Sequence, residues 1–228
     1  MPAGRGWFVT GTDTGVGKTL VSLGLMQSLQ DRGLRVAGMK PVASGCTRTQ
    51  QGLRNNDAVR LQRQSSVELD YATLNPYTFE PPVAPHIAAA QAGISMDLDV
   101  ILAAHARIAA CTDRVVVEGA GGWLVPLNES ASLADLAGRL GLEIVLVVGI
   151  RLGCLNHALL SVESIERRGP GLAGWVANCL APADAVTAAN ISALRGRIAA
   201  PLLGVVPFQD EPDARTVAGC LTLPVDLQ

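Results

Sequence analysis

Short apolar runs rich in β-branched residues recur along the chain and predict buried strands. An uninterrupted apolar run is typical of a strand that is covered on both faces of its sheet. The six runs lie at residues 6–10, 36–39, 115–117, 144–148, 174–177 and 202–206.

Longer stretches between several of these runs have the periodicity of helices, and some are closed by a glycine. They lie at residues 19–31, 98–110, 133–139, 158–168 and 185–197. Alternating strands and helices indicate an α/β fold, with a mainly parallel sheet and helices on both of its faces. Because 228 residues with 49% hydrophobic content can bury one sizeable core, we expect a single domain over residues 1–228.

One segment, residues 44–85, departs from this alternation. It contains polar and proline-bearing stretches such as TRTQQGLRNND and NPYTFEPPVAP. The segment is too long for an ordinary connection between a strand and a helix. Because such excursions often carry binding residues, we expect this one to contribute to a substrate site.

The first strand runs directly into a glycine-bearing turn and an apolar helix, in the sequence WFVTGTDTGVGKTLVSLGLMQSL. Gly15 and Gly17 permit tight turns whose backbone N–H groups converge on phosphate oxygens at the positive end of the helix. Lys18 is placed to reach the β and γ phosphates, and the Thr19 hydroxyl to ligate magnesium. Residues 11–19 therefore predict a phosphate-binding loop, or P-loop, that binds ATP with Mg²⁺.

The loop departs from the usual spacing G-x-x-x-x-G-K-[ST] in one place. That spacing puts its first glycine at position 12, where this chain has Thr12, with Gly11 one residue earlier. We therefore expect a variant P-loop. A glycine-rich turn without a ligand is the alternative, and the strand and helix on either side favour the nucleotide loop.

Two carboxylates are candidates for the magnesium site. Glu118 lies at the carboxyl end of the apolar strand in RVVVEGAGGWLVPL, just before a glycine turn. Ligands bind at the carboxyl ends of strands in an open α/β sheet, although a structural cap of the turn is an alternative role. Asp57, in LRNNDAVRL, lies where a helix begins, so a metal ligand and a simple helix cap fit its position equally well.

Lysine is rare in this chain, which has 16 arginines but only Lys18 and Lys40. A compact ammonium differs chemically from a planar guanidinium, so its use at these two positions points to a chemical requirement. Lys40 follows the second strand, in GLRVAGMKPVASGC, and projects toward the same rim as the P-loop. This placement favours a role near the γ-phosphate or a nucleophile over a solvated surface charge.

Two further strand ends offer weaker candidates. The sequence RLGCLNHALL, residues 151–160, opens a helix whose free N–H groups and Asn156 can form an anion site, although an ordinary helix start explains it equally well. Asn178 ends another strand and has an amide that can read a base. Cys179 follows it where the guanine-specific NKxD signature has lysine, which disfavours a GTP-dependent switch.

Composition argues against several other classes of function. A net charge of −2 without a basic run disfavours nucleic acid as a partner. The chain has no run of about 18 apolar residues and no secretory leader pattern, so we expect a cytoplasmic protein without a membrane partner. The five cysteines are widely spread and the three histidines lack metal-ligand spacing, so neither a disulfide framework nor a zinc site is expected.

Together the motifs resemble one family, the dethiobiotin synthetases, which are ATP-dependent cyclo-ligases. The segments that carry the resemblance cover most of the chain in order: FVTGTDTGVGKT, AGMKPVASG, GLRNNDA, LDYATLNPYTF with APHIAA, VVVEGAGGWLVPL, VVGIRLGCLNHALL, LAGWVAN and APLLGVVP. The resemblance implies a reaction on 7,8-diaminononanoate and CO₂. One amine forms a carbamate, ATP phosphorylates the carbamate oxygen, and the second amine closes the ring with release of ADP and phosphate.

The resemblance also implies roles by position. It makes Lys18, Lys40 and Thr14 catalytic, with the two lysines stabilising charge on the carbamate and the transferred phosphoryl group. It makes Thr19, Asp57 and Glu118 the magnesium ligands, and we adopt this role for Asp57. The implied nucleotide-binding positions are Gly15, Val16, Gly17, Lys18, Thr19, Leu20, Asp57, Glu118, Gly119, Ala120, Gly121, Asn178, Cys179, Pro207, Phe208, Gln209 and Asp213.

The implied substrate positions include a contribution from a second subunit. They are Ser44, Gly121, Gly153, Cys154 and Asn156. Because the family is homodimeric, the helix start at residues 153–156 is expected to receive the substrate carboxylate from the partner subunit.

Two departures and two competing functions remain. Some family members carry Glu where this chain has Gly15, so a contact by that side chain is missing, and the match after Pro207 is poor, which weakens the case for Asp213. A cobyrinate-type amide ligase shares the loop and fold, but should carry a glutaminase domain, for which we expect no room here. A partitioning-type ATPase switch typically carries a lysine early in the loop, where this chain has Thr12 and Asp13.

Overall fold

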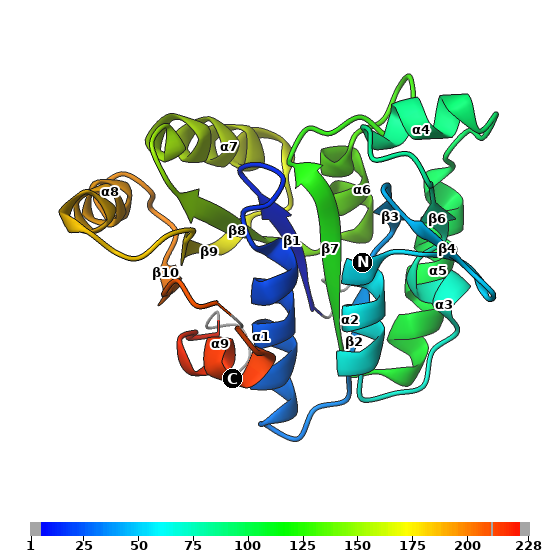
Figure 1. Cartoon of the computed structure of the whole chain (residues 1–228), viewed down its shortest axis with the longest axis horizontal. Helices are drawn as coiled ribbons and strands as arrows, with labels where there is room; N and C mark the ends of the chain where they lie inside the picture. The colour runs from blue at the N-terminus through cyan, green and yellow to red at the C-terminus, as the bar shows by residue number, and fades with distance from the viewer. Residues whose placement is uncertain (1–5, 211, 224–228) are drawn as a thin grey trace.

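The computed structural model describes residues 6–210 and 212–223, so the first five residues, used above for the absence of a leader, lie outside the described part. Its centre is a six-stranded parallel sheet in the order β10-β9-β8-β1-β7-β2 (Figure 1). The strands are β1 (Gly6–Gly11), β2 (Val36–Met39), β7 (Arg114–Gly122), β8 (Glu143–Ile150), β9 (Leu172–Cys179) and β10 (Leu202–Val206). All six predicted strands are confirmed.

Helices cover both faces of the sheet, as Figure 1 shows. One face carries α1 (Lys18–Gln30), α2 (Asn56–Gln64) and α9 (Ala214–Gly219), and the other carries α5 (Leu98–Cys111), α6 (Leu133–Leu140), α7 (Cys154–Arg168) and α8 (Ala185–Arg195). The predicted α/β fold is confirmed.

Apolar side chains of the central strands supply two separate cores. In β1, Phe8 packs into the core under α5 to α8, whereas Trp7 and Val9 pack into the core under α1. Successive side chains of a strand point to opposite faces, so a strand between two helical layers must be apolar at every position. This requirement explains why the strands appear as uninterrupted apolar runs in the sequence.

The ends of β7 and α8 and the start of α7 differ from those predicted. We expected a glycine turn directly after Glu118, and this was wrong: β7 continues to Gly122 because its backbone still pairs with β1, where Gly11 lies beside Gly122. Glu118 therefore lies within β7, and its side chain is fully buried. In addition, α7 begins at Cys154, four residues before the predicted start, and α8 ends at Arg195, two residues before the predicted end.

The excursion after β2 is ordered rather than irregular. It contains two small sheets, one of β3 (Val42–Ala43) with β6 (Tyr77–Thr78) and one of β4 (Thr47–Thr49) with β5 (Gly52–Arg54). Besides α2, it includes α3 (Tyr71–Leu74) and leads into α4 (Pro85–Gln91). These elements are two to nine residues long, and such short elements leave little periodicity in a sequence.

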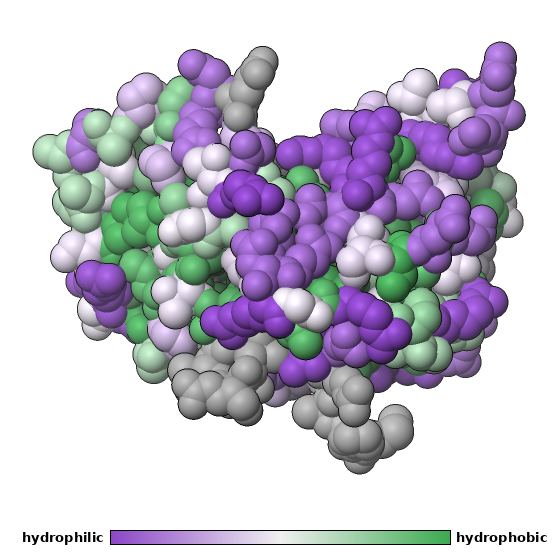
Figure 2. Space-filling model, turned by 90° about the horizontal axis from the view of Figure 1, so that it is seen from below, coloured by the Kyte–Doolittle hydropathy of each residue, from purple (hydrophilic) through white to green (hydrophobic). Residues whose placement is uncertain are grey.

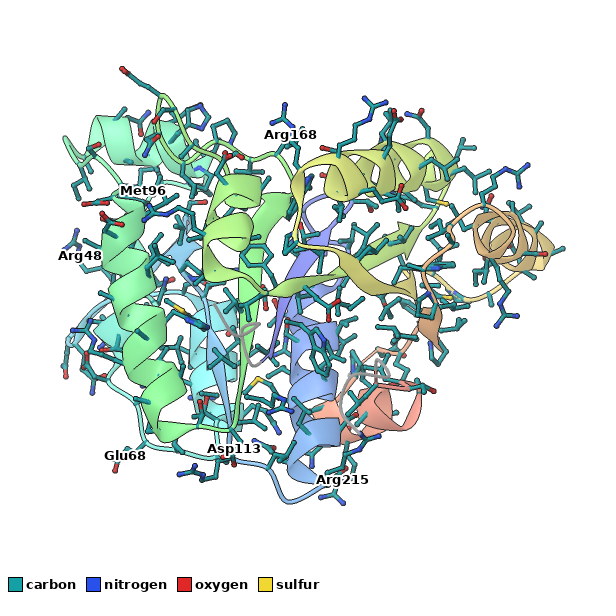
Figure 3. The ribbon with its side chains drawn as sticks, turned by 180° about the vertical axis from the view of Figure 1, so that it is seen from behind. Arg48, Glu68, Met96, Asp113, Arg168 and Arg215 are labelled. Carbon is teal, nitrogen blue, oxygen red and sulfur yellow. The ribbon has the colours of Figure 1, made fainter. Side chains whose placement is uncertain are left out.

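Sheet order places a crevice at the carboxyl edge of the strands. After β7 the chain crosses from one side of β1 to β8 on its other side, and ligands bind where strand order reverses in this way. That edge is the top of Figure 1, where β1 turns into α1. Figure 3 shows Asp113, which precedes β7, at the opposite, lower end of the sheet.

Figure 2 shows the surface at the lower end of the molecule as it is drawn in Figure 1. Its centre is largely hydrophilic, and apolar side chains gather toward the side of α8 and β10 (Figure 2). Among the residues described, no helix is both long and apolar enough to cross a lipid bilayer.

Candidate active site

The P-loop connects the end of β1 to the start of α1 at the carboxyl edge of the sheet. Gly17 has a φ of 93°, and a Cβ built there would lie 2.2 Å from Nδ2 of Asn178. Only glycine fits, because this backbone region strains other residues and a neighbouring side chain fills the space. Asn178 fixes the loop from the end of β9 by donating to the Val16 carbonyl at 2.9 Å.

A cavity of about 670 Å³ opens beside this loop. Its floor is formed by the P-loop, by Lys40 after β2 and by β7, and its far wall by the excursion after β2. The expected role of this excursion in a substrate site stays a prediction. The lining residues are Thr14, Gly15, Gly17, Lys18, Thr19, Leu20, Lys40, Ala43, Ser44, Asn55, Asp57, Arg60, Pro82, Val83, Ala84, Pro85, Glu118, Ala120, Gly121 and Val125.

The Lys40 ammonium is the centre of a buried polar cluster on the cavity floor. It donates to Glu118 Oε1 at 2.6 Å, to Asp57 Oδ2 at 3.2 Å and to the carbonyl of Gly119 at 3.1 Å. Burial opposes the charge, but the two carboxylates outweigh it and raise the pKa of the Lys40 ammonium. Lys40 is therefore a fixed cation at neutral pH.

The position of Lys40 is fixed by its backbone as well as by its side chain. Its N–H donates to the Leu74 carbonyl at 2.9 Å, and its carbonyl accepts from Asn75 Nδ2 at 2.6 Å. The Tyr71 hydroxyl donates to Asn75 Oδ1 and accepts from the backbone N–H of Asn55, the residue that caps α2. Lys40 is thus held by the same excursion that forms the cavity wall.

Lys18 is a second cation with a different environment. Its Nζ donates to the Asp13 carbonyl at 2.9 Å, and only 7% of the residue is exposed. Burial, followed by repulsion from Lys40, lowers the pKa of the Lys18 ammonium to about 8. An anion in the cavity would therefore stabilise the charged form of Lys18.

Three oxygen-bearing side chains fit the expected magnesium site. The Thr19 hydroxyl donates to Glu118 Oε1 at 2.9 Å, while Glu118 Oε2 is buried without a hydrogen-bond partner among the described residues. The Asp57 side chain is 38% exposed, so one side of it is accessible. Hydroxyl and carboxylate oxygens suit Mg²⁺, which usually completes its coordination with water and phosphate oxygens.

The donor set is small for a metal site made of protein alone. Within residues 6–210 and 212–223, no group of three or more His, Cys, Asp or Glu side chains is placed to hold a metal ion. A magnesium ion bound to Thr19, Asp57 and Glu118 would need further ligands, which the phosphate oxygens of a nucleotide can supply. The competing reading of Asp57 as a cap is excluded, because Asn55 caps α2 and Asp57 pairs with Lys40.

The remaining nucleotide positions lie beside the cavity rather than in its lining. The Val16 carbonyl accepts from Asn178 Nδ2, and the Gly119 carbonyl accepts from Lys40 Nζ. Val206 pairs with Asn178 in the sheet, which puts Pro207 next to Cys179 at the end of β9, and the neighbouring Phe208 is 41% exposed. Gln209 follows these residues in the chain. Asp213 caps α9, which packs against α1, and its carboxylate accepts from Thr216 N.

The start of α7 is separate from this cavity. Gly153 is the N-cap residue with a φ of 91°, and no side chain among the described residues caps the helix. Cys154 is buried and Asn156 is exposed. None of the three lines the cavity within the described part of one chain. Their expected role toward a partner subunit therefore stays a prediction.

Several residues of the site were not expected from the sequence. Arg60, one turn after Asp57 on α2, lines the cavity, and so does an apolar wall formed by Pro82, Val83 and Val125. Asp13 and Arg151 form an ion pair between the P-loop and the segment before α7. Nothing in the spacing of these residues sets them apart, because their proximity depends on how the sheet is ordered.

Known proteins resemble this chain in sequence over most of its length. A family model described as an AAA domain matches residues 5–216. The chain is similar to the ATP-dependent dethiobiotin synthetase of Cellvibrio japonicus (strain Ueda107), with 53% identity over 203 residues, covering 89% of each chain. It is 47% identical to an ATP-dependent dethiobiotin synthetase of Escherichia coli (strain K12) over 213 residues, covering 93% of this chain and 95% of the relative.

Solved structures share the fold at low sequence identity. A ParA family ATPase from Chlorobium tepidum TLS aligns with a TM-score of 0.57 and 13% identity, covering 95% of this chain and 97% of the other. The MinC:MinD cell division protein complex of Aquifex aeolicus includes a chain that aligns with a TM-score of 0.55 and 16% identity, covering 98% and 88%. These likenesses establish the P-loop NTPase fold alone. The sequence relatives establish more: this chain belongs to the family of ATP-dependent dethiobiotin synthetases and is an ATP-dependent ligase.

Proposed function

We propose that the chain converts 7,8-diaminononanoate and CO₂ to dethiobiotin through a carbamate and a phosphorylated carbamate, and that it releases ADP and phosphate. The relatives are named for ATP-dependent dethiobiotin synthesis, and their similarity extends over nearly the whole chain. The single observation that carries the proposal is the position of Lys40. Its ammonium lies with Thr19 and Glu118 in one cavity beside the P-loop.

Phosphorylation of a carbamate brings two anions together, so the site must supply positive charge at fixed positions. Lys18 lies at the P-loop end of the cavity and Lys40 on its floor, with the first pKa lowered to about 8 and the second raised. In this proposal Lys18 exchanges the Asp13 carbonyl for a phosphate oxygen, and Lys40 faces the carbamate and the transferred phosphoryl group. Charges fixed before the reaction stabilise the transition state without reorganising.

The other residues of the cavity have positioning roles in this proposal. Thr14, Ser44 and Gly121 line the cavity around the two lysines and contact the diamine and the carbamate. The residues on the β9–β10 side, including Asn178, contact the base. Thr19, Asp57 and Glu118 hold Mg²⁺, which supplies charge neutralisation on the phosphate oxygens when bound.

We also propose a cytoplasmic homodimer. The uncapped N-terminus of α7 presents backbone N–H groups, which favour an anion, at a place that the cavity of the same chain does not reach. A substrate carboxylate from the partner's site would satisfy these groups together with Asn156. The exposed Leu152, at 98%, supports a contact at this end of the molecule.

The test is the release of ADP from ATP, Mg²⁺ and bicarbonate in the presence and absence of 7,8-diaminononanoate. Diamine-dependent ADP release is expected, and omission of bicarbonate should suppress it. ADP release that is independent of the diamine would instead indicate a nucleotide switch. The ion pair of Asp13, at the place where the switch class has a lysine, argues against that alternative.

A further inference from the structure

Asp13 makes three contacts that join the P-loop to the end of a neighbouring strand. Its Oδ1 accepts from the backbone N–H of Thr14 at 2.7 Å, and its carbonyl accepts from Lys18 Nζ at 2.9 Å. Its other carboxylate oxygen, Oδ2, accepts from Nη2 of Arg151. Asp13 therefore contacts two residues that line the cavity, Thr14 and Lys18, and one arginine that does not.

The sheet fixes this arrangement. Gly11 pairs with Val147 of β8, and the N–H of Thr12 donates to the Val147 carbonyl at 3.0 Å. Arg151 follows directly after β8 ends. Because β1 and β8 are hydrogen-bonded neighbours, the loop after one and the segment after the other are held at the same edge of the sheet.

The negative charge of Asp13 lies in the P-loop and is paired with Arg151. The Thr14 N–H and the Arg151 guanidinium lower the pKa of the Asp13 carboxyl, so it is ionised at neutral pH. Thr14 and Lys18, its immediate partners, both line the cavity in which the nucleotide phosphates are proposed to bind. Without a cation beside it, the Asp13 carboxylate would repel the nucleotide phosphates, and the repulsion would act over the whole phosphate chain.

The ion pair is too exposed to be explained as a stabilising feature of the fold. The side chains of Arg151 and Asp13 are 47% and 46% exposed, and pairs of this kind contribute little to stability. Other exposed pairs, such as Arg139 with Asp99 and Arg167 with Glu163, involve no residue of the P-loop. A pair at the phosphate loop has an electrostatic consequence that the others lack.

We propose that Arg151 is a positioning residue for nucleotide binding, which neutralises the Asp13 carboxylate and thereby lets it fix the backbone N–H of Thr14 without repelling the phosphates. This inference rests on the nucleotide site proposed above. It assigns no contact between Arg151 and the nucleotide. The effect of removing Arg151 therefore depends on whether Asp13 is charged.

The experiment measures the affinity for Mg-ATP by titration calorimetry, and the KM and kcat of the diamine-dependent reaction, in single and double variants. Arg151→Ala should weaken ATP binding about tenfold and raise the KM for ATP in step, with kcat falling less than about threefold. Asp13→Asn keeps an acceptor for Thr14 N–H and removes the charge, so its effect should stay within about threefold. In Asp13→Asn/Arg151→Ala, affinity should return to within about twofold of Asp13→Asn.

Two conservative comparisons sharpen the result. Arg151→Lys keeps a charge opposite Asp13 and should recover most of the affinity. Arg139→Ala removes another exposed arginine–aspartate pair and should bind ATP like the unaltered chain. Light scattering on each variant checks that the oligomeric state is the same. Normal ATP affinity in Arg151→Ala overturns the inference, and so does a tenfold loss that persists in the Asp13→Asn background.

A further variant separates this inference from the proposed nucleotide site. Lys18→Ala should abolish measurable ATP binding. If it does, and Arg151→Ala has no effect, only the role of Arg151 is wrong. If Lys18→Ala binds ATP normally, the proposed nucleotide site is wrong.

Discussion

The ammonium of Lys40 lies 2.6 Å from Oε1 of Glu118, and the two side chains are only 5% and 0% exposed. A buried pair of this kind contributes little compared with a well-packed apolar pair, but removing one partner leaves a buried charge unpaired. The pair is therefore a feature kept for the site rather than for the fold, and it makes a stability prediction.

Lys40→Met should lower the free energy of unfolding by about 3–5 kcal/mol, because it leaves the Glu118 carboxylate without its buried partner. In Lys40→Met/Glu118→Gln neither charge remains, so a substantial part of this loss should be recovered. Urea unfolding followed by circular dichroism measures both. Equal losses in the single and double variants would show that the pair is not what the Lys40 substitution disrupts.

The same substitution should separate turnover from nucleotide binding. In the proposed reaction Lys18 and the P-loop bind the phosphates, whereas Lys40 faces the reacting groups. Lys40→Met should therefore reduce kcat by about 10³-fold or more while ATP still binds. Calorimetric titration with Mg-ATP, on protein shown to be folded, is the control. Near-normal turnover in Lys40→Met would remove this residue from the mechanism.

ATP binding should take up a proton at alkaline pH. The pKa of the Lys18 ammonium is about 8 in the free protein, and a bound phosphate favours the charged form, which raises that pKa. Well below pH 8 the Lys18 ammonium is already charged, so ATP binding adds no proton to it. Well above pH 8 the uptake on ATP binding should approach one proton, and the ATP affinity should fall by at most about tenfold per pH unit. Calorimetry at pH 9 in buffers of different ionisation enthalpy counts the protons. Zero uptake at this pH would place Lys18 away from the phosphates.

Gly17→Ala should abolish ATP binding while most of the fold persists. The new Cβ would lie 2.2 Å from Asn178 Nδ2, and the φ of 93° disfavours any side chain. Gly138, in the exposed middle of α6, is the matched control, because a Cβ there meets nothing within 4 Å. Gly138→Ala should raise stability by about 0.5–1 kcal/mol and leave binding intact. ATP affinity near normal in Gly17→Ala would contradict the tight loop.

Mixing two defective variants tests whether the site is shared between subunits. Asn156→Ala should raise the KM for the diamine about tenfold through loss of a hydrogen bond to a carboxylate. Asn156→Ala and Lys40→Met chains are mixed and allowed to exchange subunits. In a mixed dimer, one of the two sites then has Lys40 from the first chain and Asn156 from the second, so this site is intact. At low diamine concentration the mixture should exceed the summed activities of the separate variants. Strictly additive activity would mean that each chain uses its own Asn156.

The strand pattern and the P-loop were predictable from sequence because both depend on local chemistry. A strand buried on two faces must be apolar throughout, and the phosphate turn requires glycine at positions such as Gly17. Lys40 could be placed near the loop because parallel strands end at one edge of the sheet.

Other parts of the site depend on contacts that sequence spacing does not encode. Glu118 was expected at a turn, yet it lies inside β7, since the glycines after it keep pairing with β1. The pairing of Asp13 with Arg151 spans 138 positions and follows from the order of β1 and β8. The apolar wall at Val83 and Val125 likewise joins two segments that only the folded excursion brings together.

The central claim is that this cavity couples ATP cleavage to insertion of a carboxyl carbon between two amines. The most direct measurement supplies ATP, Mg²⁺, 7,8-diaminononanoate and ¹³C-bicarbonate, and follows the product by mass spectrometry together with ADP. We predict a dethiobiotin that carries one ¹³C atom, formed in a ratio of one to one with ADP. ADP formation without labelled product, or no diamine-dependent reaction at all, would contradict the account.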